Sequence, residues 1–514
     1  CVCGSIFNER SFLLSKLVNS NNLSIKFDLK LQKKSFLDDW NDGKVFGQDL
    51  ICIKNQLLAL IMNILSWIFS FVPEAFCTSP VIPPAGTSCA VSIMGPGGLD
   101  QLQVINMEDN GTRVTVGCNM KDMGLDPPYI NVDFTKDLDS QFDSSLVLVE
   151  VDYFSINYAD VCIRWGLYES ALRFVGFPIV PGFDLSGKII WAGMDAIPFK
   201  DSPKFNIGAE VFGFSLFGSY SRKVLVPARQ LRLSPKKMFI KGHPKYEQDL
   251  LAGIPAAAAT ALHAIALARA WPNPLKTKNK ACLIHSAAGG VGSQLVQMCK
   301  LQGFHPVVGV VGSSHKIDYC KDIGCDYIID KSKEDLWKKA KLISNDGYAA
   351  IFDANGISTL SNSFDHVTRC GSLIVYGFHS NLPKASELLS PMSWIGMIKD
   401  QLSMPSYDPM VLTLESKTIS GFNLSFFEKE HDMIELYLNQ IYTWLSNGKL
   451  KPSNVTKFNI TEVGKAHELI QSGLSKGKIV VSPIVIDSLK TNQGDNSDNS
   501  NGSNGKGKGK GKKE

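Results

Sequence analysis

The pattern of apolar and polar positions is clearest in the middle of the chain, where it predicts a strand, a turn, a helix and a second strand. Residues 281–284 form a short apolar run that suits a strand buried in a parallel sheet. After a glycine-rich turn, Leu295, Met298 and Cys299 recur at the spacing of one helical face. A second apolar run follows at 306–311. The stretch therefore predicts one βαβ unit.

Further apolar runs at 350–352 and 372–376 continue this alternation and predict an α/β fold with a doubly wound parallel sheet. The first run is followed by Asn355, and the second by Gly377 and Phe378. Ligands bind beyond the carboxyl ends of the strands in such sheets. We therefore expect these three residues to contact a bound cofactor, with a role in the turn alone as the alternative for Gly377.

The glycine-rich turn fits the dinucleotide-binding pattern G-x-G-x-x-G, with Ala287 in the first place and Gly289 and Gly292 in the others. Gly290 and Val291 lie between the two glycines. The middle glycine lets backbone amides approach a pyrophosphate, and the last lets the helix pack close to its strand. The phosphates then lie at the positive end of the helix. A tight turn without a ligand is the alternative.

The residues after the second strand favour NADPH over NADH. An NAD site normally carries Asp or Glu there for the ribose hydroxyls. This chain has Ser313, Ser314 and Lys316, and no acid before Asp318. Two hydroxyls and a cation suit a 2′-phosphate, which a carboxylate would repel. A solvated loop whose lysine has no ligand is the alternative.

The two ends of the chain differ from the globular sequence between them. Residues 57–72 are sixteen mostly apolar positions, short of the roughly 20 that a membrane-spanning helix needs. They predict either a signal or membrane anchor, or a buried or interfacial helix. Residues 491–514 are rich in Asn, Ser, Gly and Lys and predict a disordered, solvated tail.

Composition excludes several classes of protein. Of 514 residues, 44% are hydrophobic and 20% charged, as in globular proteins. The net charge of +4 is too balanced to imply a nucleic-acid partner. Twelve cysteines without a C-x-x-C pair indicate reduced thiols and no cysteine-based metal site. We expect a cytoplasmic protein, with membrane association or organelle targeting through 57–72 as the alternative.

Several segments in order along the chain resemble the medium-chain dehydrogenase/reductase superfamily, in its quinone oxidoreductase branch. With the glycine turn at 287–292, they are residues 157–160, 166–168, 178–187, 218–221, 226–228, 448–452 and 477–481. Residues 420–425 resemble the vesicle amine transport protein-like subgroup in particular. The resemblance covers about residues 92–484.

The resemblance implies a GroES-like, β-rich catalytic domain with an inserted Rossmann domain. Zinc-dependent relatives carry Gly-His-Glu where this chain has Gly182-Phe183-Asp184, and a Cys where Asn157 falls, so a zinc-free site is implied. The expected divisions are an N-terminal extension at 1–91, the catalytic domain at 92–252, the Rossmann NADP-binding domain at 253–418, a return to the catalytic domain at 419–488 and a tail at 489–514.

The implied reaction is hydride transfer from NADPH to a quinone or to an α,β-unsaturated carbonyl (enone). By family position, Asn157 and Tyr168 line the nicotinamide end, and Tyr168 is either a proton donor or a packing aromatic. Thr260 contacts the carboxamide or, alternatively, bonds its own helix backbone. Related quinone reductases often have a second Tyr where this chain has Cys162, which weakens the expectation of quinone chemistry.

Further cofactor contacts are implied for Phe422, Asn423 and Lys478, with a surface lysine as the alternative for the last. The family precedent for assembly is a homodimer. The subgroup includes proteins tied to vesicle and membrane surfaces. The alternative function is therefore a membrane- or vesicle-associated nucleotide-binding adaptor with little catalytic turnover.

Overall fold

The computed structural model describes residues 83–108, 112–118, 129–199, 202–235, 246–272, 277–378, 403–427 and 429–485. The chain divides into two compact units, Cys1–Glu74 and Ala75–Glu514, and every described residue belongs to the second. The apolar segment at 57–72 and the tail at 489–514 lie outside the described residues. Within the described ranges, no helix has both the length and the apolar character needed to cross a bilayer.

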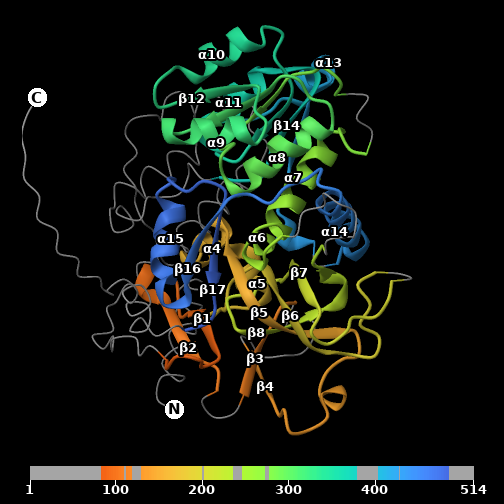
Figure 1. Ribbon diagram of the computed structural model, residues 1–514. Helices are drawn as coiled ribbons and strands as arrows, with labels where there is room; N and C mark the ends of the chain where they lie inside the picture. Colours follow the sequence, from red (N-terminus) through yellow and green to blue (C-terminus); the bar gives the residue numbers. More distant parts are fainter. Residues whose placement is uncertain are drawn as a thin grey trace, which may run out of the picture. The chain divides into compact units, whose positions relative to one another are not determined.

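One sheet is built from six parallel strands, as the apolar runs predicted (Figure 1). The strands are β10 (Cys282–Ile284), β11 (Val307–Val311), β12 (Tyr327–Asp330), β13 (Tyr348–Asp353), β14 (Val367–Val375) and β15 (Thr418–Gly421). Their order, β12-β11-β10-β13-β14-β15, is that of a doubly wound dinucleotide-binding sheet. The order reverses between β10 and β13, and ligands bind beyond the carboxyl ends of strands at such a point. The predicted α/β class is confirmed.

Helices cover both faces of this sheet. They are α7 (Pro255–Leu267), α8 (Gly290–Leu301), α9 (Ile317–Asp322), α10 (Leu336–Ile343), α11 (Ile357–Asp365) and α13 (Pro409–Glu415). In β10, Cys282 and Ile284 belong to the core shared with α7, α8 and α9, while Leu283 belongs to the core shared with α10 and α11. Burial on both faces explains why these strands are continuous apolar runs in the sequence.

The second sheet is mainly antiparallel and contains nine strands among the described residues. They are β3 (Thr112–Val116), β4 (Tyr129–Val132), β5 (Leu146–Ile156), β6 (Asp184–Ala192), β7 (Glu210–Phe214), β8 (Lys223–Pro227), β9 (Leu231–Leu233), β16 (Val455–Asn459) and β17 (Lys478–Ser482). β5 is central: one edge pairs with β6, while the other pairs first with β8 and then, at its carboxyl end, with β17. A separate hairpin comprises β1 (Cys89–Ile93) and β2 (Leu102–Asn106).

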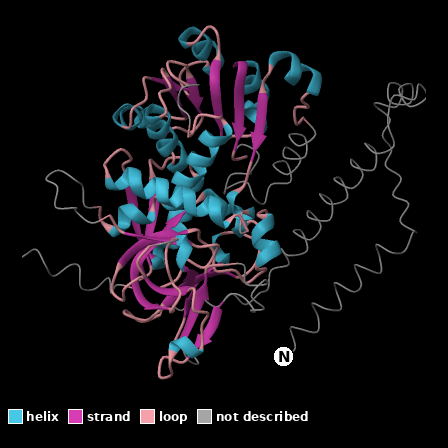
Figure 2. Cartoon of the chain, turned by 90° about the vertical axis from the view of Figure 1, so that its right-hand side faces the viewer, coloured by secondary structure: helices cyan, strands magenta, loops and turns pink. Residues whose placement is uncertain are grey.

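The antiparallel strands form a group apart from the parallel strands (Figure 2). The helices α4 (Tyr158–Arg164), α5 (Glu169–Phe174), α6 (Gln248–Ala252) and α15 (Val463–Gln471) lie mostly with the antiparallel strands. The helix α14 (His431–Ser446) packs on α7, and most of its buried side chains belong to the core shared with the parallel sheet. The expected domain divisions stay a prediction. Two strands lie across the expected limits: β15 ends at Gly421, beyond 418, and β1 begins at Cys89, before 92.

Candidate active site

A cleft of about 1510 Å³ opens at the carboxyl ends of β10 and β13. Residues of both sheets line it, among them Asn157 and Phe183 from the antiparallel side and Gly289 and Asn355 from the parallel side. Sites for a single small ligand usually measure about 300–1,000 Å³. The cleft therefore has room for a nucleotide and a second small molecule together.

The glycine turn forms the start of α8, with Gly289 as its N-cap residue. A Cβ atom added to Gly292 would lie 2.3 Å from the carbonyl oxygen of Ser286, so the close packing of helix on strand requires glycine there. A Cβ atom added to Gly290 would lie 2.6 Å from Cδ of Lys478. Gly290 therefore makes room for a lysine from the last strand, a contact that the motif alone did not indicate.

The turn residues differ in what they face. Gly289, Gly290, Val291 and Gly292 line the cleft, as expected for a phosphate site. Ala287 does not: it is fully buried, and its N–H donates to the carbonyl of Val310 at 3.0 Å. Ala287 lies beneath the turn, and its expected contact with a cofactor stays a prediction.

Cationic side chains gather where the second strand of the βαβ unit ends. Ser313 and Lys316 line the cleft, together with Lys331, which the sequence analysis missed. Nζ of Lys316 donates to the carbonyl of Gly473 at 2.5 Å rather than to a carboxylate. Burial lowers the pKa of Lys316, and the nearby charges of Lys331 and Lys476 act in the same direction. This end of the cleft thus presents positive charge to a ligand.

Ser314 does not line the cleft, and its expected role in cofactor binding stays a prediction. Its Oγ donates to Oδ2 of Asp330 at 2.6 Å, and Oγ of Ser332 donates to the other carboxylate oxygen at 2.7 Å. These hydrogen bonds hold the pKa of Asp330 below its usual range. Neither Ser314 nor Asp330 lines the cleft, so the carboxylate at this strand end is held by serines and kept from the ligand.

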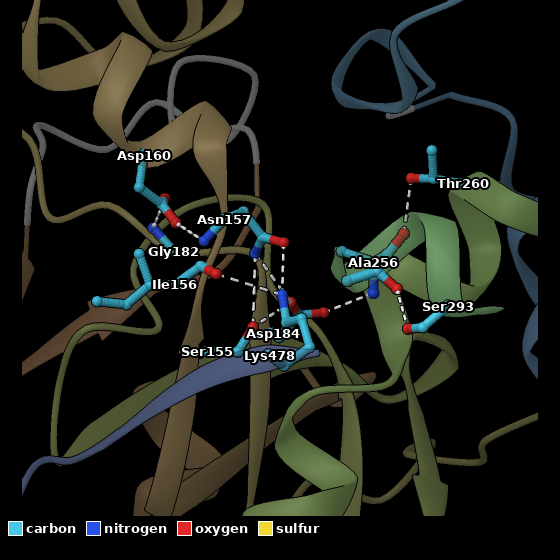
Figure 3. Close-up of polar contacts among 11 residues, drawn as sticks. Ser155, Ile156, Asn157, Asp160, Gly182, Asp184, Ala256, Thr260, Ser293 and Lys478 are labelled. Atoms are coloured by element: carbon cyan, nitrogen blue, oxygen red, sulfur yellow. Dashed lines mark hydrogen bonds and ion pairs between the residues drawn. The ribbon is translucent and has the colours of Figure 1, made fainter. Parts of the chain in front are cut away.

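A buried polar cluster forms the other end of the cleft (Figure 3). Nζ of Lys478 donates to Oδ1 of Asn157 at 2.7 Å and lies 3.5 Å from Oδ2 of Asp184. Nδ2 of Asn157 donates to the same Asp184 oxygen at 2.9 Å. Lys478 is 4% exposed and Asp184 is fully buried, which excludes the alternative of a surface lysine. Burial lowers the pKa of Lys478, although Asp184 and Asp160 oppose this shift.

A second buried network of hydrogen bonds fixes the backbone of Asn157 (Figure 3). Oδ2 of Asp160 accepts from the backbone N–H of Asn157 at 2.8 Å, and Oδ1 accepts from that of Gly182 at 3.1 Å. Burial raises the pKa of Asp160 to about 7. Tyr220 also bonds Asp160, and its hydroxyl lies 3.4 Å from Nε2 of His467, whose pKa burial lowers to about 3.

Tyr168 joins the two sides of the cleft. Its hydroxyl donates to Oδ1 of Asn423 at 3.0 Å, and its ring packs edge-on against Phe183 at 5.9 Å. Burial raises the pKa of Tyr168 to about 12, so the phenol is neutral at physiological pH. The residue is therefore both packed and hydrogen-bonded, and the two interpretations made from sequence are not mutually exclusive.

The other expected contacts also line the cleft: Thr260, Asn355, Gly377, Phe378, Phe422 and Asn423. Oγ1 of Thr260 donates to the carbonyl of Ala256 at 2.6 Å, the bond to its own helix that was the alternative for this residue. A Cβ atom on Gly377 would lie 2.7 Å from the carbonyl oxygen of Ala354, so this glycine is also required by the turn.

Two protein-family profiles match the chain in the regions of the two sheets. Residues 143–236 match the alcohol dehydrogenase GroES-like domain, and residues 290–439 match the zinc-binding dehydrogenase family. The chain belongs to the medium-chain dehydrogenase/reductase superfamily. The antiparallel sheet is accordingly the GroES-like domain, and the parallel sheet is the Rossmann domain.

Relatives within the superfamily are distant. The synaptic vesicle membrane protein VAT-1 homolog of Danio rerio is 25% identical over 339 residues, which cover 66% of this chain and 64% of that protein. The chain thus spans just under two thirds of that relative. A probable quinone oxidoreductase of Schizosaccharomyces pombe is 26% identical over 352 residues, covering 68% of this chain and 91% of the relative.

Solved structures of the superfamily share the fold. The human synaptic vesicle membrane protein VAT-1 homolog-like protein matches with a TM-score of 0.55 and 20% identity, over 77% of this chain and 98% of that one. The Escherichia coli quinone oxidoreductase complexed with NADPH matches with a TM-score of 0.56 and 18% identity, over 77% of this chain and 100% of the other.

In the part of the chain that the structure describes, no three His, Cys, Asp or Glu side chains are grouped so as to hold a metal ion.

Sequence reasoning missed a set of cleft residues on segments without a recognisable motif: Cys118, Leu216, Arg229, Gln230, Phe427, Lys429, His431 and Ile434. Their convergence depends on tertiary packing, so the sequence carried no signal for it.

Proposed function

We propose that this protein is a zinc-independent, NADPH-dependent oxidoreductase that reduces an enone or a quinone. The observation that carries the proposal is a single cleft with a glycine-rich helix N-terminus at its centre, two lysines at one end and a buried polar cluster at the other. The E. coli structure named above is a complex with NADPH, and other matched structures include the CurK enoyl reductase. These names support a nicotinamide cofactor and a small-molecule substrate.

The residues present fit NADPH. The amides of Gly289–Gly292 and the N-terminus of α8 would hold the pyrophosphate, because these residues line the cleft and three of the four are glycines. Ser313, Lys316 and Lys331 would hold the 2′-phosphate. Asn157, Thr260 and Lys478 would face the nicotinamide end.

When bound, the cofactor supplies the hydride. The chain's own residues orient the substrate and exclude water. Asn157 is fixed by Lys478, Asp184 and Asp160, so its amide is presented to the cleft in one orientation. The hydroxyl of Tyr168, neutral because its pKa is about 12, is a proton donor rather than a base. The Tyr168 hydroxyl donates a hydrogen bond to Oδ1 of Asn423, and a substrate oxygen would compete with Asn423 for this bond.

The test is binding and turnover with the full chain. We expect NADPH to raise the melting temperature more than NADH does, and to be oxidised in the presence of an enone or quinone from a small panel. A larger shift with NADH would contradict the assignment of Ser313, Lys316 and Lys331. The homodimer implied by the resemblance is part of the same proposal, and sedimentation velocity checks it.

A second proposal is a nucleotide-binding adaptor with little turnover that associates with membranes or vesicles. The names of the relatives described as synaptic vesicle membrane proteins favour it. Tight NADPH binding without oxidation across the substrate panel, together with co-sedimentation with vesicles, would support this proposal over the first.

A further inference from the structure

The cleft is also lined by residues that the proposed cofactor does not need. Three apolar residues line it, Leu216, Phe427 and Ile434, and three basic residues do as well, Arg229, Lys429 and His431. Leu216 and Arg229 come from the GroES-like domain, whereas the others belong to α14 and the segment before it. We call this set of six residues the basic arm.

Contacts between neighbouring residues connect the basic arm to the catalytic end. The ring of Phe183, which packs on Tyr168, lies 5.3 Å from the ring of Phe217. The next residue back along the chain, Leu216, donates its N–H to the carbonyl of Gly117 at 3.1 Å. That carbonyl also accepts from Nε2 of Gln230 at 3.0 Å, and Gln230 is adjacent to Arg229. These contacts connect Phe183, which packs on Tyr168, to Leu216 and Arg229, and all four residues line the same cleft.

Among the three basic residues of the arm, Arg229 is half-buried, whereas Lys429 and His431 are exposed. Its Nη2 lies 3.2 Å from Nε2 of His431, and across the described ranges it forms no ion pair with a carboxylate. A guanidinium has five N–H donors, so one bond to an imidazole leaves most of them for another partner. Guanidinium groups bind carboxylates and phosphates in a bidentate manner.

The acidic residues near Arg229 are hydrogen-bonded to other groups or exposed to solvent. Asp143 also lines the cleft, and its Oδ1 accepts from both N–H and Oγ of Ser145, at 2.8 and 2.6 Å. Glu430 and Asp432 flank His431 in sequence and are exposed. Within the described ranges none of the three forms an ion pair with Arg229, so its guanidinium keeps N–H donors for an anionic ligand.

We infer that the substrate of the proposed reaction is an elongated apolar carbonyl compound with an anionic group at its far end, held by Arg229 with Lys429 and His431. The inference rests on the proposed function and names its substrate class. Substrates that end in a carboxylate and substrates that end in a phosphate share this chemistry: an anionic oxygen group on an apolar chain. Its carbonyl would lie at Asn157 and Tyr168, and its carboxylate or phosphate at the basic arm.

Equilibrium binding to the full chain tests the inference, with and without NADPH. The probes are dodecanoate, dodecyl phosphate and methyl dodecanoate. We expect the anions to bind about tenfold or more tightly than the ester, because the ester presents no charge to the guanidinium. Whichever anion binds more tightly identifies the head group as carboxylate or phosphate.

Arg229→Gln is the deciding variant, and Arg173→Gln is its matched control because Arg173 is exposed and outside the cleft. Arg229→Gln should weaken the tighter-binding anion about tenfold and leave methyl dodecanoate and NADPH affinity unchanged. Arg173→Gln should change none of these. Unchanged NADPH affinity also shows that the variant is folded.

Turnover provides a second readout. A ten-carbon enone with a terminal carboxylate should have a lower KM than its methyl ester, and Arg229→Gln should remove the difference. Equal binding of acid and ester, or an unchanged anion affinity in Arg229→Gln, would overturn the inference while leaving the proposed function intact. Failure to bind NADPH would instead overturn the proposed function, and the measurements without nucleotide still decide the inference.

Discussion

Nζ of Lys478 lies 2.7 Å from Oδ1 of Asn157, although 321 positions separate the two residues in the chain. The contact joins the carboxyl end of β5 to the start of β17, two strands that pair side by side. It also places the lysine stem against Gly290 at the nucleotide turn. One side chain therefore links the polar cluster of the GroES-like domain to the phosphate-binding turn of the Rossmann domain.

Gly290→Ala tests this link. The added Cβ would lie 2.6 Å from Cδ of Lys478, and the lysine cannot move without losing its bonds to Asn157 and Asp184. We expect NADPH affinity to fall about tenfold, and stability by about 1–3 kcal/mol from overpacking. Titration of NADPH fluorescence and urea unfolding measure the two effects.

The matched control for that variant is Gly464→Ala. Gly464 lies in the first turn of α15, and an added Cβ would meet no atom within 4 Å. Alanine there should be neutral or stabilising by up to about 1 kcal/mol, because it favours the helix. Equal effects of the two substitutions would refute the steric role of Gly290.

Lys478→Met should strongly destabilise the fold. It leaves the fully buried carboxylate of Asp184 without its cationic partner, a change that typically costs about 3–5 kcal/mol. The double variant Lys478→Met, Asp184→Asn removes the unpaired charge and should recover much of the loss. Urea unfolding of both single variants and of the double variant gives the coupling energy, and purely additive effects would argue against the pair.

Lys316→Ala and Lys331→Ala should each weaken NADPH binding about tenfold and leave NADH binding nearly unchanged, because each lysine faces the position of the 2′-phosphate. Lys338→Ala, an exposed lysine on α10, is the control. Equal losses for both nucleotides would mean that the lysines serve the fold rather than the choice of cofactor. Isothermal titration calorimetry makes the comparison.

Tyr168→Phe keeps the ring against Phe183 and removes the hydroxyl bonded to Asn423. We expect kcat to fall about tenfold to a hundredfold with the preferred enone, within the range for general acid catalysis, while the free energy of unfolding falls by about 1 kcal/mol. Because the pKa of Tyr168 is about 12, its titration should not affect kcat below pH 10. An unchanged kcat would limit Tyr168 to packing.

Asp160 and His467 should act oppositely on stability as the pH changes. The pKa of Asp160 is raised to about 7, so its contribution is present below its unfolded pKa of about 3.9 and is lost as the pH rises through 7. The pKa of His467 is lowered to about 3, so its contribution is present above about 6.5 and is lost as the pH falls toward 3. Each effect is at most about 1.4 kcal/mol per pH unit.

Between pH 7 and pH 5 the two effects therefore oppose each other in the wild type. Asp160→Asn should make acidification over this range more destabilising, and His467→Gln should make it less so. The measurement is the change in the free energy of unfolding between the two pH values, which separates the titration from the fixed cost of each substitution. Identical slopes in all three proteins would exclude both titrations.

More of the fold than of the candidate site could be predicted from the sequence. Apolar runs and the glycine turn revealed the parallel sheet, because strands buried on both faces leave a continuous signal. The choice between Ser313 and Ser314 depends on which hydroxyl reaches Asp330, and no local pattern encodes that contact. Arg229 shows the same limit. It follows β8 without a motif, and α14 brings His431 to it from 202 positions away.

The pairing of β17 with β5 also has a consequence for synthesis of the protein. At about 5–20 residues per second, the ribosome adds Lys478 on the order of tens of seconds after it has completed β5. Throughout that interval the carboxyl end of β5 lacks its neighbour and presents unpaired backbone groups, a common template for aggregation. This edge of β5 is therefore open to pairing with other chains until β17 has left the ribosome.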